Sequence, residues 1–260
     1  MKRAYADIPE GQVHYRIDGE GYPVLLLHQS PASSAEYAEV MAVLSRSYLV
    51  VAMDTMGYGM SDRPAPGVTV ADYARHAGEF LDTLRLGPVH LVAHHTGATI
   101  ALELTLTRPA LVNKLVLSGY PYYTPEMWRA QLEAAQADWP LRPAADGSHA
   151  MDLWNALRKY NPGTAPELSH RTLTSGLLSG ERREDGHLAI LRYPEQERLP
   201  LLKHPTLLLC GSNDPFFPHL EATRRLIPHC ATKVIAGGTS NMILARAQEF
   251  AAAVAEFLGG

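Results

Sequence analysis

Apolar residues recur along the chain in short unbroken runs, separated by stretches with helical periodicity. Runs this short, with no alternating polar positions, are typical of strands buried on both faces. They occupy residues 23–28, 48–53, 88–93, 113–118, 205–210 and 232–236. Residues 12–18 alternate instead, as expected of a strand with one face in solvent. Helices are expected at 33–46, 69–86, 96–107, 218–226 and 241–258. This order predicts an α/β fold whose mainly parallel sheet is flanked by helices.

Residues 120–198 interrupt this alternation. They contain helical pieces, tryptophans and tyrosines, and proline and glycine breaks, but no clear buried strand. An insertion above the carboxyl ends of parallel strands would cover the crevice in which open α/β sheets usually bind ligands. We therefore expect a helical cap at 120–198, inserted before the last two strands, on a core formed by 1–119 and 199–260. The alternative is a helical excursion that only packs against the core.

Composition and charge narrow the functional classes. The 260 residues are 46% hydrophobic with a formal net charge of −4, which is ordinary for a globular protein with a sizeable core. Mild acidity and the absence of a basic run argue against nucleic acid or an anionic membrane surface as a partner. The first residues lack the apolar core of a secretory signal, and two cysteines are too few for a disulfide framework. We expect a cytoplasmic protein acting on a small molecule, and a homodimer stays open.

Five segments together resemble the α/β-hydrolase fold family over nearly the whole chain. They correspond to the strand and oxyanion loop, an Asp-x-x-Gly-x-Gly-x-Ser segment, the nucleophile elbow, the acid-bearing loop and the histidine-bearing loop with its helix. The segments are 25–31, 53–64, 92–101, 207–218 and 236–250. The resemblance implies the fold of that family and an active site at the carboxyl ends of its strands.

The residues at the catalytic positions depart from that family. Its elbow pattern is Gly-x-Ser-x-Gly, whereas this chain has Ala-His-His-Thr-Gly, which places His95 at the serine position. With the register set on Phe250, the family's histidine position falls on Ser240. Asp214 stands where the family keeps its acid, and Gln29 replaces the glycine of the oxyanion loop. Hydroxyl, imidazole and carboxylate are thus all present, with two of them exchanged.

A histidine at the elbow suits proton transfer better than serine acyl-enzyme chemistry. His95 would lie at a helix N-terminus, where the helix dipole disfavours positive charge and keeps the imidazole able to accept a proton. We expect His95 to be the general base, or alternatively a covalent nucleophile. Ser240 and Asp214 are expected to form a supporting hydrogen-bonded pair.

The remaining site residues are expected to bind the substrate. The backbone N–H of Thr96, and one from Gln29 or Ser30, would stabilise an oxyanion. Three aromatic residues close to a strand end are expected to reach the pocket: Tyr120, Tyr122 and Trp128.

These expectations describe an enzyme acting on a small, largely apolar carbonyl or ester compound. The chain has no phosphate-binding glycine motif and no set of metal ligands with metal spacing, so neither a cofactor nor a metal is expected. Two alternatives remain, because fold does not fix function. One is a non-hydrolytic enzyme, namely a lyase, a decarboxylase or a cofactor-free oxygenase. The other is a non-catalytic binder of a small molecule.

Overall fold

The structure is a computed structural model that describes residues 1–138, 142–160 and 163–260. Its centre is an eight-stranded sheet with the order β1-β2-β4-β3-β5-β6-β7-β8. The neighbours from β4 to β8 are all parallel, whereas β2 runs antiparallel to both β1 and β4. The strands are β1 (Lys2–Ile8), β2 (Gly11–Asp18), β3 (Tyr22–Leu27), β4 (Tyr48–Met53), β5 (Val89–His94), β6 (Val112–Ser118), β7 (Thr206–Gly211) and β8 (Ala231–Ile235). The predicted mainly parallel α/β sheet is therefore confirmed, and β1 is the strand that the sequence pattern missed.

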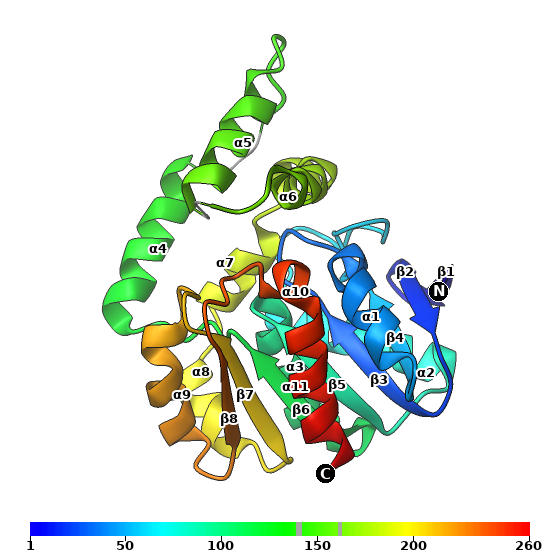
Figure 1. Cartoon of the computed structure of the whole chain (residues 1–260). Coiled ribbons are helices and arrows are strands. Elements are labelled where there is room, and N and C mark those ends of the chain that lie inside the picture. Colours follow the sequence, from blue (N-terminus) through cyan, green and yellow to red (C-terminus); the bar gives the residue numbers. More distant parts are fainter. Residues whose placement is uncertain (139–141, 161–162) are drawn as a thin grey trace.

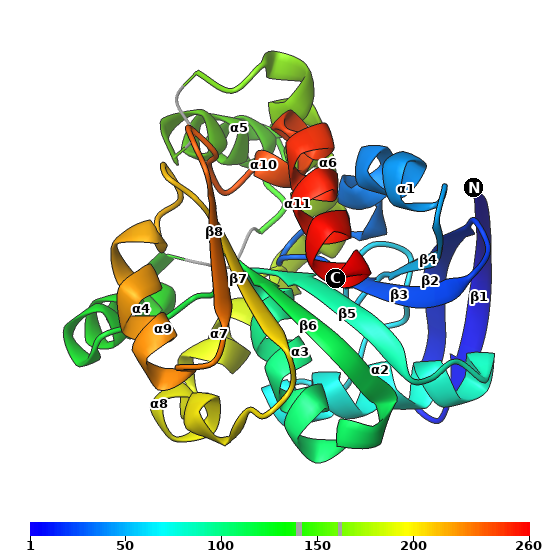
Figure 2. The same ribbon diagram turned by 60° about the horizontal axis from the view of Figure 1, so that its bottom comes forward.

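Helices cover both faces of this sheet (Figures 1 and 2). On one face, α1 (Ala38–Leu44) and α11 (Ala247–Gly259) enclose a core that includes Tyr37, Met41 and Phe250. On the other face, α2 (Val70–Leu84) and α3 (Thr96–Thr107) pack over residues such as Phe80 and Leu104. The short helices α9 (Leu220–Leu226) and α10 (Met242–Ala245) follow β7 and β8. Two enclosed cores hold the strands in place, so their carboxyl ends form one rigid edge.

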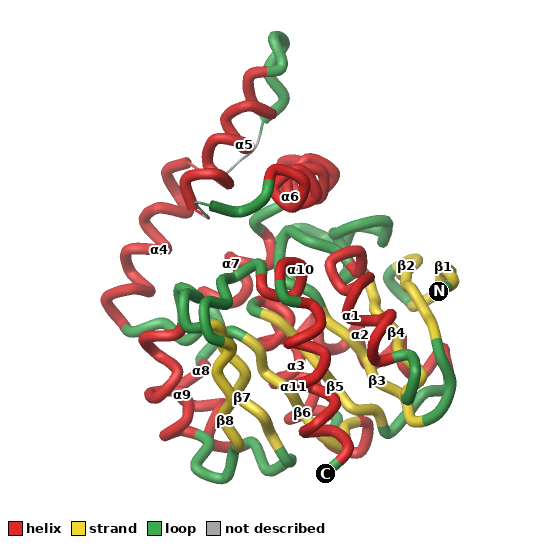
Figure 3. The backbone as a smooth tube through the Cα atoms, viewed as in Figure 1, coloured by secondary structure: helices red, strands yellow, loops and turns green. Residues whose placement is uncertain are grey.

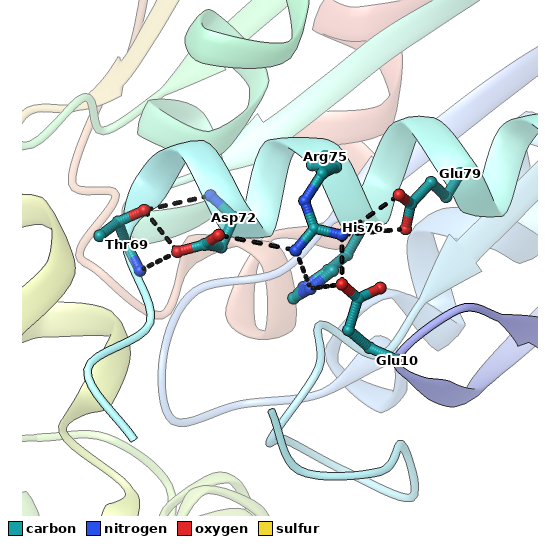
Figure 4. Close-up of polar contacts among 6 residues, drawn as sticks. All are labelled: Glu10, Thr69, Asp72, Arg75, His76 and Glu79. Carbon is teal, nitrogen blue, oxygen red and sulfur yellow. Dashed lines mark hydrogen bonds and ion pairs between the residues drawn. The ribbon is translucent and has the colours of Figure 1, made fainter. Parts of the chain in front are cut away.

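Helix α2 begins where its sequence predicts. Thr69 accepts a hydrogen bond from the Asp72 N–H, and the Asp72 side chain accepts one from the Thr69 N–H in return. This capping box satisfies backbone donors that have no partner within the helix. One turn later, Arg75 bonds the carboxylates of Glu10 and Glu79 (Figure 4). These contacts join α2 to the turn between β1 and β2.

The segment between β6 and β7 is helical in its described parts. It contains α4 (Pro125–Asp138), α5 (Ser148–Tyr160), α6 (Pro166–Ser179), α7 (Asp185–Leu191) and α8 (Glu195–Arg198). In Figure 3, α4, α5 and α6 rise beyond the sheet edge, and α7 lies between α6 and the sheet. Residues 139–141 and 161–162 of the predicted cap lie outside the described residues.

Candidate active site

The turn from β5 into α3 is sharp and strained at His95. Its backbone has φ 47° and ψ −117°, a conformation that non-glycine residues rarely adopt. The His95 N–H bonds the Ser118 carbonyl at 2.9 Å, and the His95 carbonyl accepts from the Ala98 N–H at 2.7 Å. Gly97 permits this turn because a Cβ there would lie 2.5 Å from the Leu27 carbonyl oxygen. The side chain of His95 is thereby held at the edge formed by the strand ends.

The His95 imidazole reaches the predicted acid directly. Its Nε2 lies 2.8 Å from Oδ2 of Asp214, whose side chain is fully buried. The other carboxylate oxygen accepts the Phe216 N–H at 2.9 Å. Burial raises the pKa of Asp214, but attraction and hydrogen bonding from His95 outweigh burial and leave the pKa below its usual value. The carboxylate is therefore ionised, which places the ring proton of neutral His95 on Nε2 and the lone pair on Nδ1.

The His95 ring lies in a space that only a glycine leaves open. Gly119 follows β6 with φ +53°, and a Cβ there would lie 2.6 Å from Nε2 of His95 and 3.0 Å from Oδ2 of Asp214. Phe216 contacts the ring edge at a centroid distance of 5.2 Å. The imidazole is longer than a serine side chain, and here it spans the whole gap between the elbow and the acid. The structure therefore pairs Asp214 with His95, and the Ser240–Asp214 pair stays a prediction.

His94 links the elbow to the loop that carries Ser240. Its ring stacks on His95 at a centroid distance of 4.1 Å. Its Nε2 donates to the Ser240 carbonyl at 2.9 Å, and its Nδ1 lies 3.0 Å from the Ser118 hydroxyl. Burial is the main cause that lowers the pKa of His94 to about 3, so it stays neutral. His94 therefore supports the site from below.

Gln29 occupies the loop after β3 in an unexpected way. Its backbone N–H donates to Oε1 of buried Glu36 at 3.1 Å, so this N–H does not point toward an oxyanion. Its side-chain amide bridges Glu36 and the Ser240 carbonyl, at 3.2 Å and 3.3 Å. Burial raises the pKa of Glu36 to about 8. Because the Gln29 N–H is bonded to Glu36, the Ser30 N–H is left as the candidate donor from this loop.

The two candidate donors that remain, the N–H groups of Ser30 and Thr96, belong to residues in contact with each other. The Ser30 N–H points at the Thr96 hydroxyl over a long 3.4 Å. The Thr96 N–H is at the first position of α3, where no carbonyl within the helix can accept it. His28 supports this loop, since its ring accepts the Thr55 N–H at 2.9 Å and lies 2.8 Å from the Gln29 carbonyl.

A cavity of about 750 Å³ opens above these residues. His95, Thr96, Ser240, Gln29 and Ser30 all line it, together with residues of α6 and α7. Nδ1 of His95 has no hydrogen-bond partner in the described part of the chain. This nitrogen is not enclosed by protein atoms, and His95 lines the cavity, so Nδ1 is open to a molecule in the cavity.

The three predicted aromatic residues do not line this cavity. Tyr120 is buried in the core below the sheet edge, Tyr122 packs beside that core, and the Trp128 indole N–H bonds the Leu191 carbonyl. Tyr123 and Phe216 line the cavity instead. The chain turns sharply after Gly119, and its conformation there directs Tyr120 inward, which spacing alone does not reveal.

The described residues contain no group of three or more histidine, cysteine, aspartate or glutamate side chains arranged to hold a metal ion. Over the same described ranges, no helix combines the length and apolar character needed to cross a bilayer.

Comparisons with known proteins agree with the fold. A family model described as the alpha/beta hydrolase fold matches residues 22–244. The (E)-2-((N-methylformamido)methylene)succinate hydrolase of Acinetobacter baylyi is 33% identical over 125 residues, which are 48% of each chain. The 2-(acetamidomethylene)succinate hydrolase of Mesorhizobium japonicum is 29% identical over 182 residues, 70% of this chain and 63% of that one. The matched region thus spans about half to somewhat under two thirds of these relatives. The crystal structure of a bromoperoxidase from Bacillus anthracis superposes over 100% of both chains with a TM-score of 0.85 at 20% identity.

Proposed function

Because the chain belongs to the α/β-hydrolase fold family, we propose that it hydrolyses a small carbonyl or ester compound with His95 as the general base. The observation that carries the proposal is the 2.8 Å contact between elbow residue His95 and buried Asp214. The two curated relatives are named as hydrolases of substituted succinates, which supports hydrolysis of a small molecule. Their partial coverage leaves the substrate itself to experiment.

In this proposal His95 activates water. Nδ1 accepts a proton from a water in the cavity while Nε2–H stays bonded to Asp214, whose charge stabilises the imidazolium that forms. The resulting hydroxide attacks the substrate carbonyl carbon. The N–H groups of Thr96 and Ser30 then stabilise the negative oxygen. As the bond between the carbonyl carbon and the leaving group breaks, the imidazolium gives its proton to the leaving group. The products are a carboxylic acid and the protonated leaving group, and no acyl-enzyme forms.

Ser240 and the segment 120–198 complete the proposed site. Ser240 lines the cavity beside His95, so we assign it to substrate or water contact and not to nucleophilic attack. We assign 120–198 as a cap, because residues such as Ser175 of α6 and His187 of α7 form part of the cavity wall. A wall of this kind excludes bulk water and strengthens the interactions inside.

A substrate panel tests the proposal. Wild type, His95→Ala and the exposed control His229→Ala are compared on short nitrophenyl esters, small lactones and N-acyl enamides, in H₂¹⁸O. We expect His95→Ala to be slower by about 10²–10⁴-fold, the range for general-base catalysis, and the control to match wild type. Equal rates for wild type and His95→Ala would refute the role of His95. Product formation without ¹⁸O uptake would indicate the non-hydrolytic enzyme class.

A further inference from the structure

Arg183 lies in the cavity wall with an N–H group that nothing satisfies. Its Nε is buried and has no hydrogen-bond partner in the described part of the chain. Its side chain is only 19% exposed, and Nη2 is paired with Glu184 at 2.8 Å. A buried donor without an acceptor costs roughly 1–3 kcal/mol. Nε itself is enclosed, but other atoms of the Arg183 side chain line the cavity, so the guanidinium can meet a bound molecule there.

The position of Arg183 is fixed by its neighbours. Glu184 holds the guanidinium on one side and also bonds Nδ1 of His187 at 2.5 Å. The Arg183 carbonyl accepts the Tyr58 hydroxyl at 3.1 Å, and Tyr58 in turn accepts the Gly186 N–H at 2.6 Å. A side chain held in this way loses little conformational entropy when it binds a ligand.

This segment packs directly on the oxyanion loop. A Cβ at Gly186 would lie 2.2 Å from the Ser30 hydroxyl, so the backbone of α7 touches that residue. Ser30 points at Thr96, the neighbour of His95. Arg183 therefore belongs to the same end of the cavity wall as the reacting groups.

The charges that line the cavity, those of Arg183 and Glu184 included, favour an anion. Four arginines face three carboxylates, of which Asp54 and Glu184 are ionised because hydrogen bonds outweigh their burial and hold their pKa values low. Glu36 is mostly protonated at neutral pH, since burial raises its pKa to about 8. The arginines are Arg3, Arg16, Arg171 and Arg183.

Two of these arginines form a cross-strand pair of like charges. Arg3 and Arg16 lie directly opposite each other on β1 and β2, where like charges destabilise a sheet. No ion pair of either residue occurs within the described ranges, whereas Arg171 is paired with Glu39. Excess positive charge around the cavity of a chain with net charge −4 attracts anionic ligands.

We propose that Arg183 binds a carboxylate of the substrate, so that the protein acts on a carbonyl, ester or amide compound that also carries a free carboxylate. The guanidinium donates to one carboxylate oxygen, and its ion pair with Glu184 keeps it oriented. The reacting carbonyl then lies toward Ser30 and Thr96. This inference deepens the proposed function, and it rests on the cavity being the substrate site.

Binding of matched probes tests the inference. Succinate is compared with succinamide, and benzoate with benzamide, by calorimetry at low ionic strength on His95→Ala, which cannot turn substrates over in our account. We expect at least one acid to bind tenfold or more tightly than its amide. Arg183→Gln should abolish that preference, Arg183→Lys should retain part of it, and the surface control Arg225→Gln, at a side chain 75% exposed, should leave it unchanged.

Three outcomes would overturn the inference. They are equal binding of acids and amides, no binding of either acid, and an acid preference that survives in a folded Arg183→Gln. Because the binding assay uses His95→Ala, its result is independent of catalysis. An acid preference in a protein that fails the substrate panel would therefore reject the proposed hydrolysis and keep the carboxylate site.

Discussion

Replacing Gly119 with alanine is expected to break the His95–Asp214 pair. The new Cβ would lie 2.5 Å from Cδ2 and 2.6 Å from Nε2 of His95, whereas carbon contacts are normally about 3.5–4.0 Å. The ring must therefore move by about 1 Å. A move of that size stretches the 2.8 Å hydrogen bond to Asp214 beyond its useful range.

The expected effects on stability and activity have separate causes. Alanine at φ +53° is strained by about 1 kcal/mol, and overpacking against the ring adds roughly 1–3 kcal/mol. A misplacement of about 1 Å in a catalytic group costs on the order of 10²-fold in rate. Urea unfolding and kcat/KM on the best substrate of the panel measure the two effects.

Gly67 offers a matched control. Its φ is +82° and no heavy atom lies within 4 Å of a built Cβ, so Gly67→Ala should show only the backbone strain and normal activity. The steric argument also predicts that, when His95 is already alanine, Gly119→Ala costs little more than Gly67→Ala, since only the 3.0 Å contact with Oδ2 of Asp214 remains. An equal loss of stability for Gly119→Ala with and without the His95 imidazole would refute the reasoning.

Two further predictions concern the groups around His95. For Glu36, whose pKa of about 8 in the folded state exceeds its ordinary 4.5, the folded protein holds a proton that the unfolded chain releases, so stability falls as pH rises between these values. Glu36→Gln should reduce this fall in the free energy of unfolding by a few kcal/mol, on the order expected from linkage. Urea unfolding at pH 5 and pH 8 measures it, and an unchanged dependence of stability on pH would contradict the assignment. Exchanging the two corners in His95→Ser with Ser240→His should produce an acyl-enzyme burst on activated esters that neither single variant shows, because triad residues act as a unit. A folded double variant without a burst would mean that the loops no longer hold triad geometry.

The sheet could be predicted from the sequence because burial on both faces leaves an unmistakable pattern. Continuous apolar runs marked β3 to β7 to within a residue or two, and Thr69 with Asp72 marked the start of α2. Strand β1 was missed because its sequence, KRAYADI, mixes exposed charged residues with few apolar ones. An edge strand has only one covered side, and its hydrophobic signal is correspondingly weak.

The sequence predicted which residues lie in the candidate active site, but it did not predict which side chains contact each other there. The order of strand-end loops indicated that His95 and Asp214 lie close together. Their direct contact depends on the length of the imidazole and on Gly119, which is distant in sequence from both. The Gln29–Glu36 bond and the orphaned Nε of Arg183 likewise arise from tertiary packing that no spacing along the chain encodes.

The most direct test of the central claim compares kcat/KM of Asp214→Asn with that of Ser240→Ala. Asparagine removes the charge that keeps the His95 proton on Nε2, so we expect a loss of about 10²–10⁴-fold. Ser240→Ala should stay within about tenfold of wild type, since the account assigns the attack to water and only a contact to Ser240. A Ser240→Ala variant as inactive as His95→Ala, with Asp214→Asn still active, would contradict the account and identify Ser240 as the nucleophile.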